Sequence, residues 1–309
     1  MIVNTGQRTD IPAFYSEWLL GRLRAGEVLV RNPYDPAAVT RYRLDPAVVD
    51  LMVFCTKDPG PMLDHMALLA PFRQYWFMTI TPYGREIEPR VPGKRTALER
   101  FRRLSDLVGP ERVVWRYDPI FVSADYPVER HLRAFKYMAA ALEGYTRIAV
   151  ISFIDLYEKT RRNFPEAREV SPEDRLTLGR AMIDIAGAHG MVVRPCAEGD
   201  ALAAYGADCS GCFTLADCER AVGSRLRVPA FKPARAACAC MLQCDIGAYN
   251  TCGHLCRYCY ANADPRQVAA NMRAHDPASP LLTGRLRPGD AIHDARQVSW
   301  IDGQLRMEL

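Results

Sequence analysis

The sequence contains no run of apolar residues near the roughly 20 that a membrane-spanning helix needs. Its first residues lack a basic region followed by an apolar stretch, which argues against a secretion signal. A disulfide framework is not expected in a protein that stays inside the cell. We therefore expect a cytoplasmic protein whose eleven cysteines are reduced and free to bind metal.

Strong charge of one sign is also absent. The net charge is +4 over 309 residues, and no stripe of alternating basic and aromatic residues is present. Both features argue against a nucleic-acid-binding protein, which usually carries a concentrated basic surface. No internal repeat or low-complexity linker divides the chain, so the sequence is typical of an ordinary globular protein.

The first two-thirds of the chain alternates short apolar runs with amphipathic stretches, the pattern of βα units on a parallel sheet. We expect strands at 2–4, 51–55, 76–81, 113–117, 148–153 and 191–194. Helices are expected between them at 13–24, 62–70, 95–108, 127–142 and 172–189. The last helix has the clearest ends, since Ser171 can cap it, Pro172 suits its first turn, Asp174 completes a capping box and Gly190 can end it.

Six such units are too few for a closed eight-stranded barrel but suit an open one. We expect an α/β protein in which residues 1–196 form a partial, TIM-type (β/α)6-like barrel. Residues 197–309 would form a cysteine-rich iron–sulfur lobe and tail, packed on the mouth of the barrel. A hairpin is expected at 28–30 and 39–44, and a closing strand pair at 297–300 and 304–307.

Charged residues follow two of the expected strands, where the ligand site of a parallel sheet lies. Arg8 and Asp10 could bind a carboxylate or a ribose, or could form a local ion pair that fixes the turn. Arg116 and Asp118 repeat this arrangement, and for them a buried salt bridge between strand ends is the favoured alternative. All four are candidate catalytic residues.

Further candidates follow the other strands. Lys57 could pair with a cofactor carboxylate or donate a proton, or it could simply face solvent. Glu198 could contact a substrate amine or orient a cluster ligand. Thr79, Thr81 and Tyr83 alternate along one strand face and could line a cofactor cavity.

Ten of the eleven cysteines lie between residues 196 and 259, and the last three form a C-x3-C-x2-C motif of Cys252, Cys256 and Cys259. Three thiolates on one compact loop fit an iron–sulfur cubane whose fourth iron has no protein ligand. Zinc sites usually take four ligands, often from two separate C-x2-C pairs. His254 could complete a zinc set, so zinc is the alternative.

The run Tyr249-Asn-Thr-Cys252-Gly-His-Leu-Cys256-Arg-Tyr-Cys259-Tyr-Ala resembles the cluster loop of radical S-adenosylmethionine enzymes, especially the spore photoproduct lyase-like branch. The resemblance implies a 4Fe-4S cluster that binds and cleaves S-adenosylmethionine, with Tyr258 beside the adenine. In that superfamily the cysteines follow the first strand of the barrel. Here they follow the last strand, so the loop would have to reach the same face from the other end of the chain.

A second resemblance covers nearly the whole chain. Several blocks look like an uncharacterised bacterial family, domain of unknown function 1848: Gln7-Arg-Thr-Asp-Ile-Pro-Ala-Phe-Tyr-Ser-Glu-Trp18, Val28-Leu-Val-Arg-Asn-Pro33, Thr56-Lys57, Trp115-Arg-Tyr-Asp-Pro119, Ile151-Ser-Phe153, Cys196-Ala-Glu198 and Asp245-Ile-Gly-Ala-Tyr-Asn-Thr-Cys252. Cys55 departs from the pattern of that family, which has tryptophan there. A small core residue is the favoured role for Cys55.

The remaining cysteines could hold a second cluster. The family resemblance implies Cys196 and Cys209 together with Cys238 and Cys240, whereas local spacing alone favours a group of Cys209, Cys212 and Cys218. Both sets stay open at this point. Some of these thiols could instead be small buried residues.

These patterns predict an iron–sulfur redox enzyme, of the radical S-adenosylmethionine type, that acts on a small or medium organic substrate. It would take electrons from a donor such as ferredoxin or flavodoxin. One alternative keeps the clusters without radical chemistry, for electron transfer or Lewis-acid catalysis. Another is a metal-stapled module that binds nucleic acid.

Overall fold

The computed structural model describes residues 1–230 and 240–303 and contains a six-stranded parallel sheet. Its strand order, β1-β4-β5-β6-β7-β8, follows the chain order, and β1 and β8 are its two edges. The strands are β1 (Ile2–Asn4), β4 (Leu51–Thr56), β5 (Gln74–Thr79), β6 (Val113–Ile120), β7 (Ile148–Phe153) and β8 (Val192–Pro195). The expected α/β class and the six parallel strands are confirmed, and all six strands end at the same edge of the sheet.

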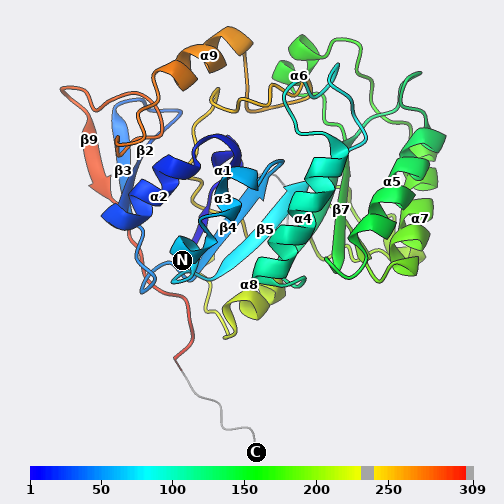
Figure 1. The fold of residues 1–309 in the computed structure, drawn as a ribbon, viewed down its shortest axis with the longest axis horizontal. Helices are drawn as coiled ribbons and strands as arrows, with labels where there is room; N and C mark the ends of the chain where they lie inside the picture. The colour runs from blue at the N-terminus through cyan, green and yellow to red at the C-terminus, as the bar shows by residue number, and fades with distance from the viewer. Residues whose placement is uncertain (231–239, 304–309) are drawn as a thin grey trace, which may run out of the picture.

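Helices cover one face of this sheet and bury the larger of two apolar cores. They are α1 (Ile11–Phe14), α2 (Ser16–Ala25), α3 (Gly60–Leu63), a 3-10 turn at Met66–Leu69, α4 (Lys94–Val108), α5 (Val128–Leu142) and α7 (Pro172–Ala188). The short helix α6 (Glu158–Asn163) lies instead beyond the ends of the strands (Figure 1). Aromatic rings fill the interface: Phe54 stacks on Trp76 at 4.0 Å, and Trp115 stacks on Phe135 of α5 at 4.6 Å. Such close packing fixes the strands whose ends carry the candidate site.

Most helix ends agree with the local sequence signals. Ser171 accepts a hydrogen bond from the backbone of Asp174, Pro172 opens α7, and Gly190 follows it with a left-handed φ of 69°. The expected helix 13–24 is instead divided between α1 and α2. Its break lies at Tyr15, whose backbone leaves the helical region and whose hydroxyl donates to the carbonyl of Thr251, 2.6 Å away. The expected helix 62–70 is likewise divided, between α3 and the 3-10 turn.

The cysteine-rich part of the chain covers the second face of the sheet. This smaller core joins strand residues to Cys196, Cys212 and the segment around α8 (Leu215–Val222). Phe213 packs between Tyr75 and Phe77 of β5, with ring centroids 4.9 and 5.6 Å away. The segment therefore contacts the interior of the sheet as well as its end. A 3-10 turn (Ala203–Tyr205) and α9 (Pro265–Arg273) complete this part of the chain.

A separate three-stranded sheet lies beside α2 (Figure 1). β2 (Glu27–Arg31) and β3 (Ala38–Arg43) form the expected antiparallel hairpin, which is confirmed, and β9 (Ala291–Asp294) pairs parallel to β3. The expected strand at 297–300 is wrong. The side chain of Gln297 both accepts from and donates to the backbone of Arg43 there, in place of a ladder of backbone bonds. The expected strand at 304–307 lies outside the described residues.

Candidate functional site

The loop that carries Cys252, Cys256 and Cys259, here called the cluster loop (residues 250–263), crosses the carboxyl ends of the strands. The backbone of Arg257 donates to Ile87, and that of Arg90 donates to His254, so the loop is joined to the segment that follows β5. On its other side, Thr160 of α6 donates to the carbonyl of Tyr258. The loop therefore reaches the edge of the sheet where the candidate catalytic residues were expected.

The shape of the loop depends on a few special positions. Asn250 and Leu255 have left-handed φ values of 58° and 56°. A Cβ added to Gly253 would lie 2.7 Å from the ring of Phe14, so only glycine allows this approach to α1. Asn262 donates to the carbonyl of Cys252 at 2.8 Å, which closes the loop. These contacts hold the loop in one conformation.

The three thiols of the loop are close enough to influence one another. Burial, followed by the neighbouring thiols and Asp10, raises the pKa of Cys252 well above its usual range. The backbone N–H of Ala261 donates to the sulfur of Cys259 at 3.3 Å, a contact typical of cluster ligands. Across residues 1–230 and 240–303, no three histidine, cysteine or acidic side chains gather closely enough to hold a single metal ion.

Asp10 connects the loop to the first two strands of the sheet. Its carboxylate accepts hydrogen bonds from the Thr56 hydroxyl at 2.7 Å, from the Lys57 backbone at 2.7 Å and from the His254 ring at 2.9 Å. It also caps α1 through the backbone of Ala13. The alternative of a local Arg8–Asp10 ion pair is therefore wrong: Arg8 instead donates to the carbonyl of Asp245.

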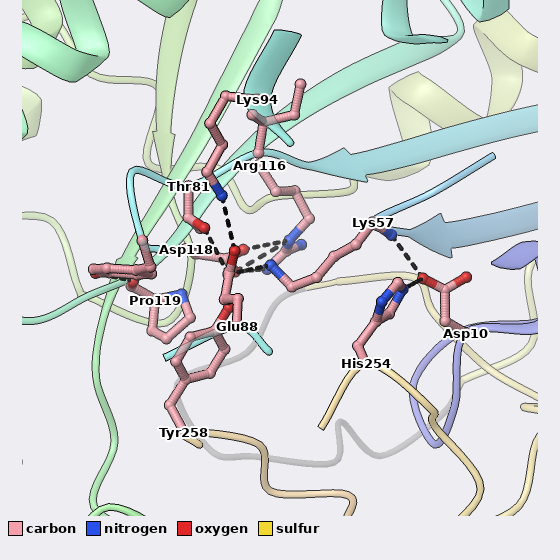
Figure 2. Close-up of polar contacts among 12 residues, drawn as sticks. Asp10, Lys57, Thr81, Glu88, Lys94, Arg116, Asp118, Pro119, His254 and Tyr258 are labelled. Carbon is pink, nitrogen blue, oxygen red and sulfur yellow. Dashed lines mark hydrogen bonds and ion pairs between the residues drawn. The ribbon is translucent and has the colours of Figure 1, made fainter. Parts of the chain in front are cut away.

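A buried charge network, which we call the Glu88 network, lies on the other side of Lys57 (Figure 2). The Glu88 carboxylate accepts from the ammonium groups of Lys57 and Lys94, each 2.9 Å away, from the Thr81 hydroxyl at 2.6 Å and from the Tyr258 hydroxyl. Although burial favours the neutral acid, the two lysines lower the pKa of Glu88 to about 2. The Lys57 side chain is only 13% exposed, so the alternative in which it faces solvent is wrong.

Arg116 and Asp118 form an ion pair with 2.5 Å between nitrogen and oxygen. Both residues lie on β6 and are partly buried, so the pair does not join the ends of two strands as expected. Burial disfavours the charge of Arg116, but Asp118 and neighbouring thiols raise its pKa well above the usual range. One guanidinium nitrogen lies 3.7 Å from the sulfur of Cys196, which in turn lies 3.5 Å from the sulfur of Cys212. Cys240 shares a side-chain hydrogen bond with Cys212. We call Cys196, Cys212 and Cys240 the second thiol group.

The other cysteines are distributed unevenly around this group. Cys55 interacts electrostatically with Cys212 and Cys240, so it lies beside the second thiol group. Cys218, on α8, interacts electrostatically with Cys240. Cys209 is more exposed, and the groups that shift its pKa upward, after burial, are Asp200 and Asp208 rather than thiols. Cys238 lies outside the described residues.

Two other candidates, Tyr83 and Glu198, have structural partners. Tyr83 is almost fully buried, stacks on Phe121 at 4.3 Å and donates to the carbonyl of Pro119. Glu198 accepts from the backbone of Phe153 and from Arg175, both at 2.8 Å. Thr79 is the last residue of β5 and is half-buried. Only Thr81 among the three alternating residues of β5 and its extension joins the Glu88 network.

Sequence reasoning missed Glu88 and Lys94 as members of the site. It also missed Asp245, whose carbonyl accepts a hydrogen bond from Arg8. Glu88 follows β5 in a proline-rich segment, where it has no distinctive spacing to a partner. Its position after a strand of the parallel sheet is the one signal that could have indicated a site residue.

Comparison with known proteins adds one finding. A family model described as domain of unknown function (DUF1848) matches residues 2–261, which include the strands of the parallel sheet and the three cysteines of the cluster loop. No curated protein matches the chain. Within the described residues, no helix combines the length and the apolar character needed to cross a membrane.

Proposed function

This chain belongs to the DUF1848 family, whose description specifies no reaction, and we propose that it is an iron–sulfur redox enzyme of the radical S-adenosylmethionine type. The observation that carries the proposal is the position of one loop with three cysteines across the carboxyl ends of six parallel strands. Catalytic sites of such sheets lie at this edge. In this view the sheet forms a partial barrel, and the cluster loop covers its mouth.

The donor set of the loop fits a 4Fe-4S cluster. Cys252, Cys256 and Cys259 offer three thiolates, and the N–H of Ala261 already donates to one of these sulfurs. When bound, such a cluster with one iron free of protein ligands supplies an electron that cleaves S-adenosylmethionine into methionine and a 5′-deoxyadenosyl radical. The protein's own residues would hold the cluster, balance its charge and exclude water.

The side chains around the loop can balance the negative charge of a bound cluster. Lys57 and Lys94 carry two positive charges, and Glu88 carries one negative charge, so the Glu88 network has an excess positive charge beside the loop. Lys57 acts electrostatically on the thiol of Cys256. Three thiolates and an iron–sulfur core are negative overall, and a buried cation offsets part of the cost of burying them.

The second thiol group supports an auxiliary site for electron relay or substrate binding. Cys196, Cys212 and Cys240 lie beside the buried guanidinium of Arg116, which would compensate for thiolate charge as Lys57 does at the cluster loop. Electrons would come from a small donor protein such as ferredoxin or flavodoxin, and the substrate would be a small or medium organic molecule.

The test is metal analysis of protein purified without oxygen. We expect iron and sulfide near eight per chain if both sites hold cubanes, and an electron paramagnetic resonance signal that changes when S-adenosylmethionine is added. Cys256→Ser should remove about half of the iron, whereas Cys209→Ser, at a thiol outside both groups, should leave the iron content unchanged. Stoichiometric zinc without iron would overturn the proposal.

Radical chemistry requires a second readout. The reduced protein should release 5′-deoxyadenosine from S-adenosylmethionine, and Cys256→Ser should abolish the release. A protein with its full iron content that releases none would be an iron–sulfur protein of another kind, acting in electron transfer or as a Lewis acid.

A further inference from the structure

A cavity of about 500 Å³ opens next to the cluster loop, outside the two thiol groups. Its walls come from the β2–β3 hairpin, from residues 246–250, from residues 281–283 and from Lys159 of α6. Tyr260, which directly follows Cys259, also lines it. The volume lies in the range of small-molecule sites, which is about 300–1,000 Å³.

One part of the cavity is lined by apolar and aromatic side chains. Leu29, Leu281 and Leu282 are buried, whereas Tyr34 is 86% exposed. Tyr249, which also lines the cavity, is half-buried. Aromatic rings beside apolar side chains suit a ligand with a planar ring.

The charged part of the cavity is positive. Arg8 and Lys159 approach the ring of Tyr249 at 5.6 and 4.7 Å from its centroid. Arg31 also lines the cavity, but Asp290 neutralises it through two hydrogen bonds of 2.7 and 2.6 Å. Among the described residues, none of the side chains that line the cavity is acidic.

The two cations differ in their surroundings. Lys159 is half-buried and forms no ion pair with a carboxylate in the described part of the chain, and its charge acts on the nearby thiol of Cys259. Arg8 donates to the carbonyl of Asp245, and the nearby carboxylate of Asp245 offsets part of its charge. Arg8 would then contribute directed N–H donors, and Lys159 a positive charge that no carboxylate offsets.

The wall beside these cations is already fixed without a ligand. Ile246 donates its backbone N–H to Asn4 of β1 at 2.9 Å, and Gly247 donates to Asp245 at 2.7 Å. A Cβ on Gly247 would lie 3.0 Å from Thr9 and 3.4 Å from Arg8, so glycine lets this wall pack against the loop that carries Arg8. A preformed wall lowers the entropic cost of binding.

We propose that this cavity binds the organic substrate, and that the substrate is an anion: a carboxylate or phosphate held by Arg8 and Lys159, attached to a planar ring that packs against Tyr34 and Tyr249. The assignment as substrate rests on the proposed function, because the cavity adjoins Cys259 through Tyr260. The anion site itself requires only the residues that line it.

The test is calorimetric binding to the full chain, purified without oxygen, with three matched probes: 2-naphthyl phosphate, 2-naphthoate and neutral 2-naphthol. At least one anion should bind about tenfold or more tightly than the neutral probe, and the two anions distinguish phosphate from carboxylate. The double variant Arg8→Gln/Lys159→Gln should lose this advantage. Lys136→Gln, the same change at an exposed site on α5, should retain it.

Equal binding of the anions and the neutral probe, binding of none of them, or an unchanged preference in the double variant would overturn the anion site. Circular dichroism and thermal unfolding of the double variant should match those of the parent chain, and Lys159→Gln alone should reduce the anion preference if the double variant does not fold. Iron content, measured on the same preparation, tests the proposed function separately, since probe binding needs no cluster.

Discussion

The Glu88 network makes a quantitative prediction about stability. Glu88 is 1% exposed and binds the ammonium groups of Lys57 and Lys94, which are 13% and 29% exposed, so Glu88→Gln would leave both cations without their carboxylate. Breaking a buried ion pair by removing one partner costs about 3–5 kcal/mol, and the lower end applies here because Lys94 is partly exposed. The pKa of Glu88, lowered from 4.5 to about 2 by the same two lysines, corresponds to a similar value of about 3 kcal/mol. We therefore expect Glu88→Gln to lower the free energy of unfolding by about 3 kcal/mol at pH 7.

The lowered pKa of Glu88 also determines how the stability difference changes with pH. Because the folded carboxyl binds its proton more weakly than the unfolded one, the stabilisation is complete above about pH 5 and is lost as the pH falls towards 2. At pH 3 the difference between Glu88→Gln and the parent chain should have shrunk to about 1 kcal/mol. Urea unfolding followed by tryptophan fluorescence at both pH values measures it.

Two further variants separate the network from a general loss of charge. Glu99→Gln removes an exposed carboxylate that pairs with Arg95 on α4, and it should cost less than about 0.5 kcal/mol. Combining Glu88→Gln with Lys57→Met removes both members of one buried pair, so the double variant should recover part of the loss. Equal losses for the two glutamine variants, or a loss that does not depend on pH, would refute the reasoning.

Three other predictions concern separate parts of the chain. Cys212→Ser should remove the iron of the second site, whereas Cys209→Ser should not, and equal iron contents would contradict the proposed second thiol group. Burial lowers the pKa of His131 to about 4, so its ring should remain neutral at pH 5.5; a titration midpoint near 6.5 by nitrogen-15 NMR would contradict this. Gly253→Ala places a methyl group 2.7 Å from Phe14 and should cost about 1–3 kcal/mol; unchanged thermal unfolding would show that the loop shifts freely.

The strands and most helices could be predicted because their signals are local. The expected strands 2–4 and 148–153 have the observed bounds, since each contains a short apolar run that can be recognised locally. The cap at Ser171 acts on Asp174, only three residues away. Helix 13–24 was predicted as one piece because its break depends on a distant partner, the carbonyl of Thr251.

The candidate site could be predicted only in part, for the same reason. The cysteine motif and the charges at strand ends are local patterns, but two of the four partners of Glu88, Lys57 and Tyr258, lie 31 and 170 residues away along the chain. The second thiol group likewise joins Cys196 to Cys212 and Cys240, although spacing alone grouped Cys212 with Cys209 and Cys218. No local spacing encodes which of several cysteines converge after folding.

The contact between Asp10 and His254 explains how a motif at the far end of the chain can belong to the edge of this sheet. The two residues are 244 positions apart, yet their side chains lie 2.9 Å from each other. In a parallel sheet every strand ends on the same side, so a loop that crosses the strand ends can reach the end of the first strand even though it follows the last strand in the sequence. What fixes the loop is a set of acceptors at that edge: Asp10 after β1 and Glu88 after β5. The position of the cysteine motif in the sequence therefore constrains its function less than Asp10 and Glu88, the side chains that bind the loop.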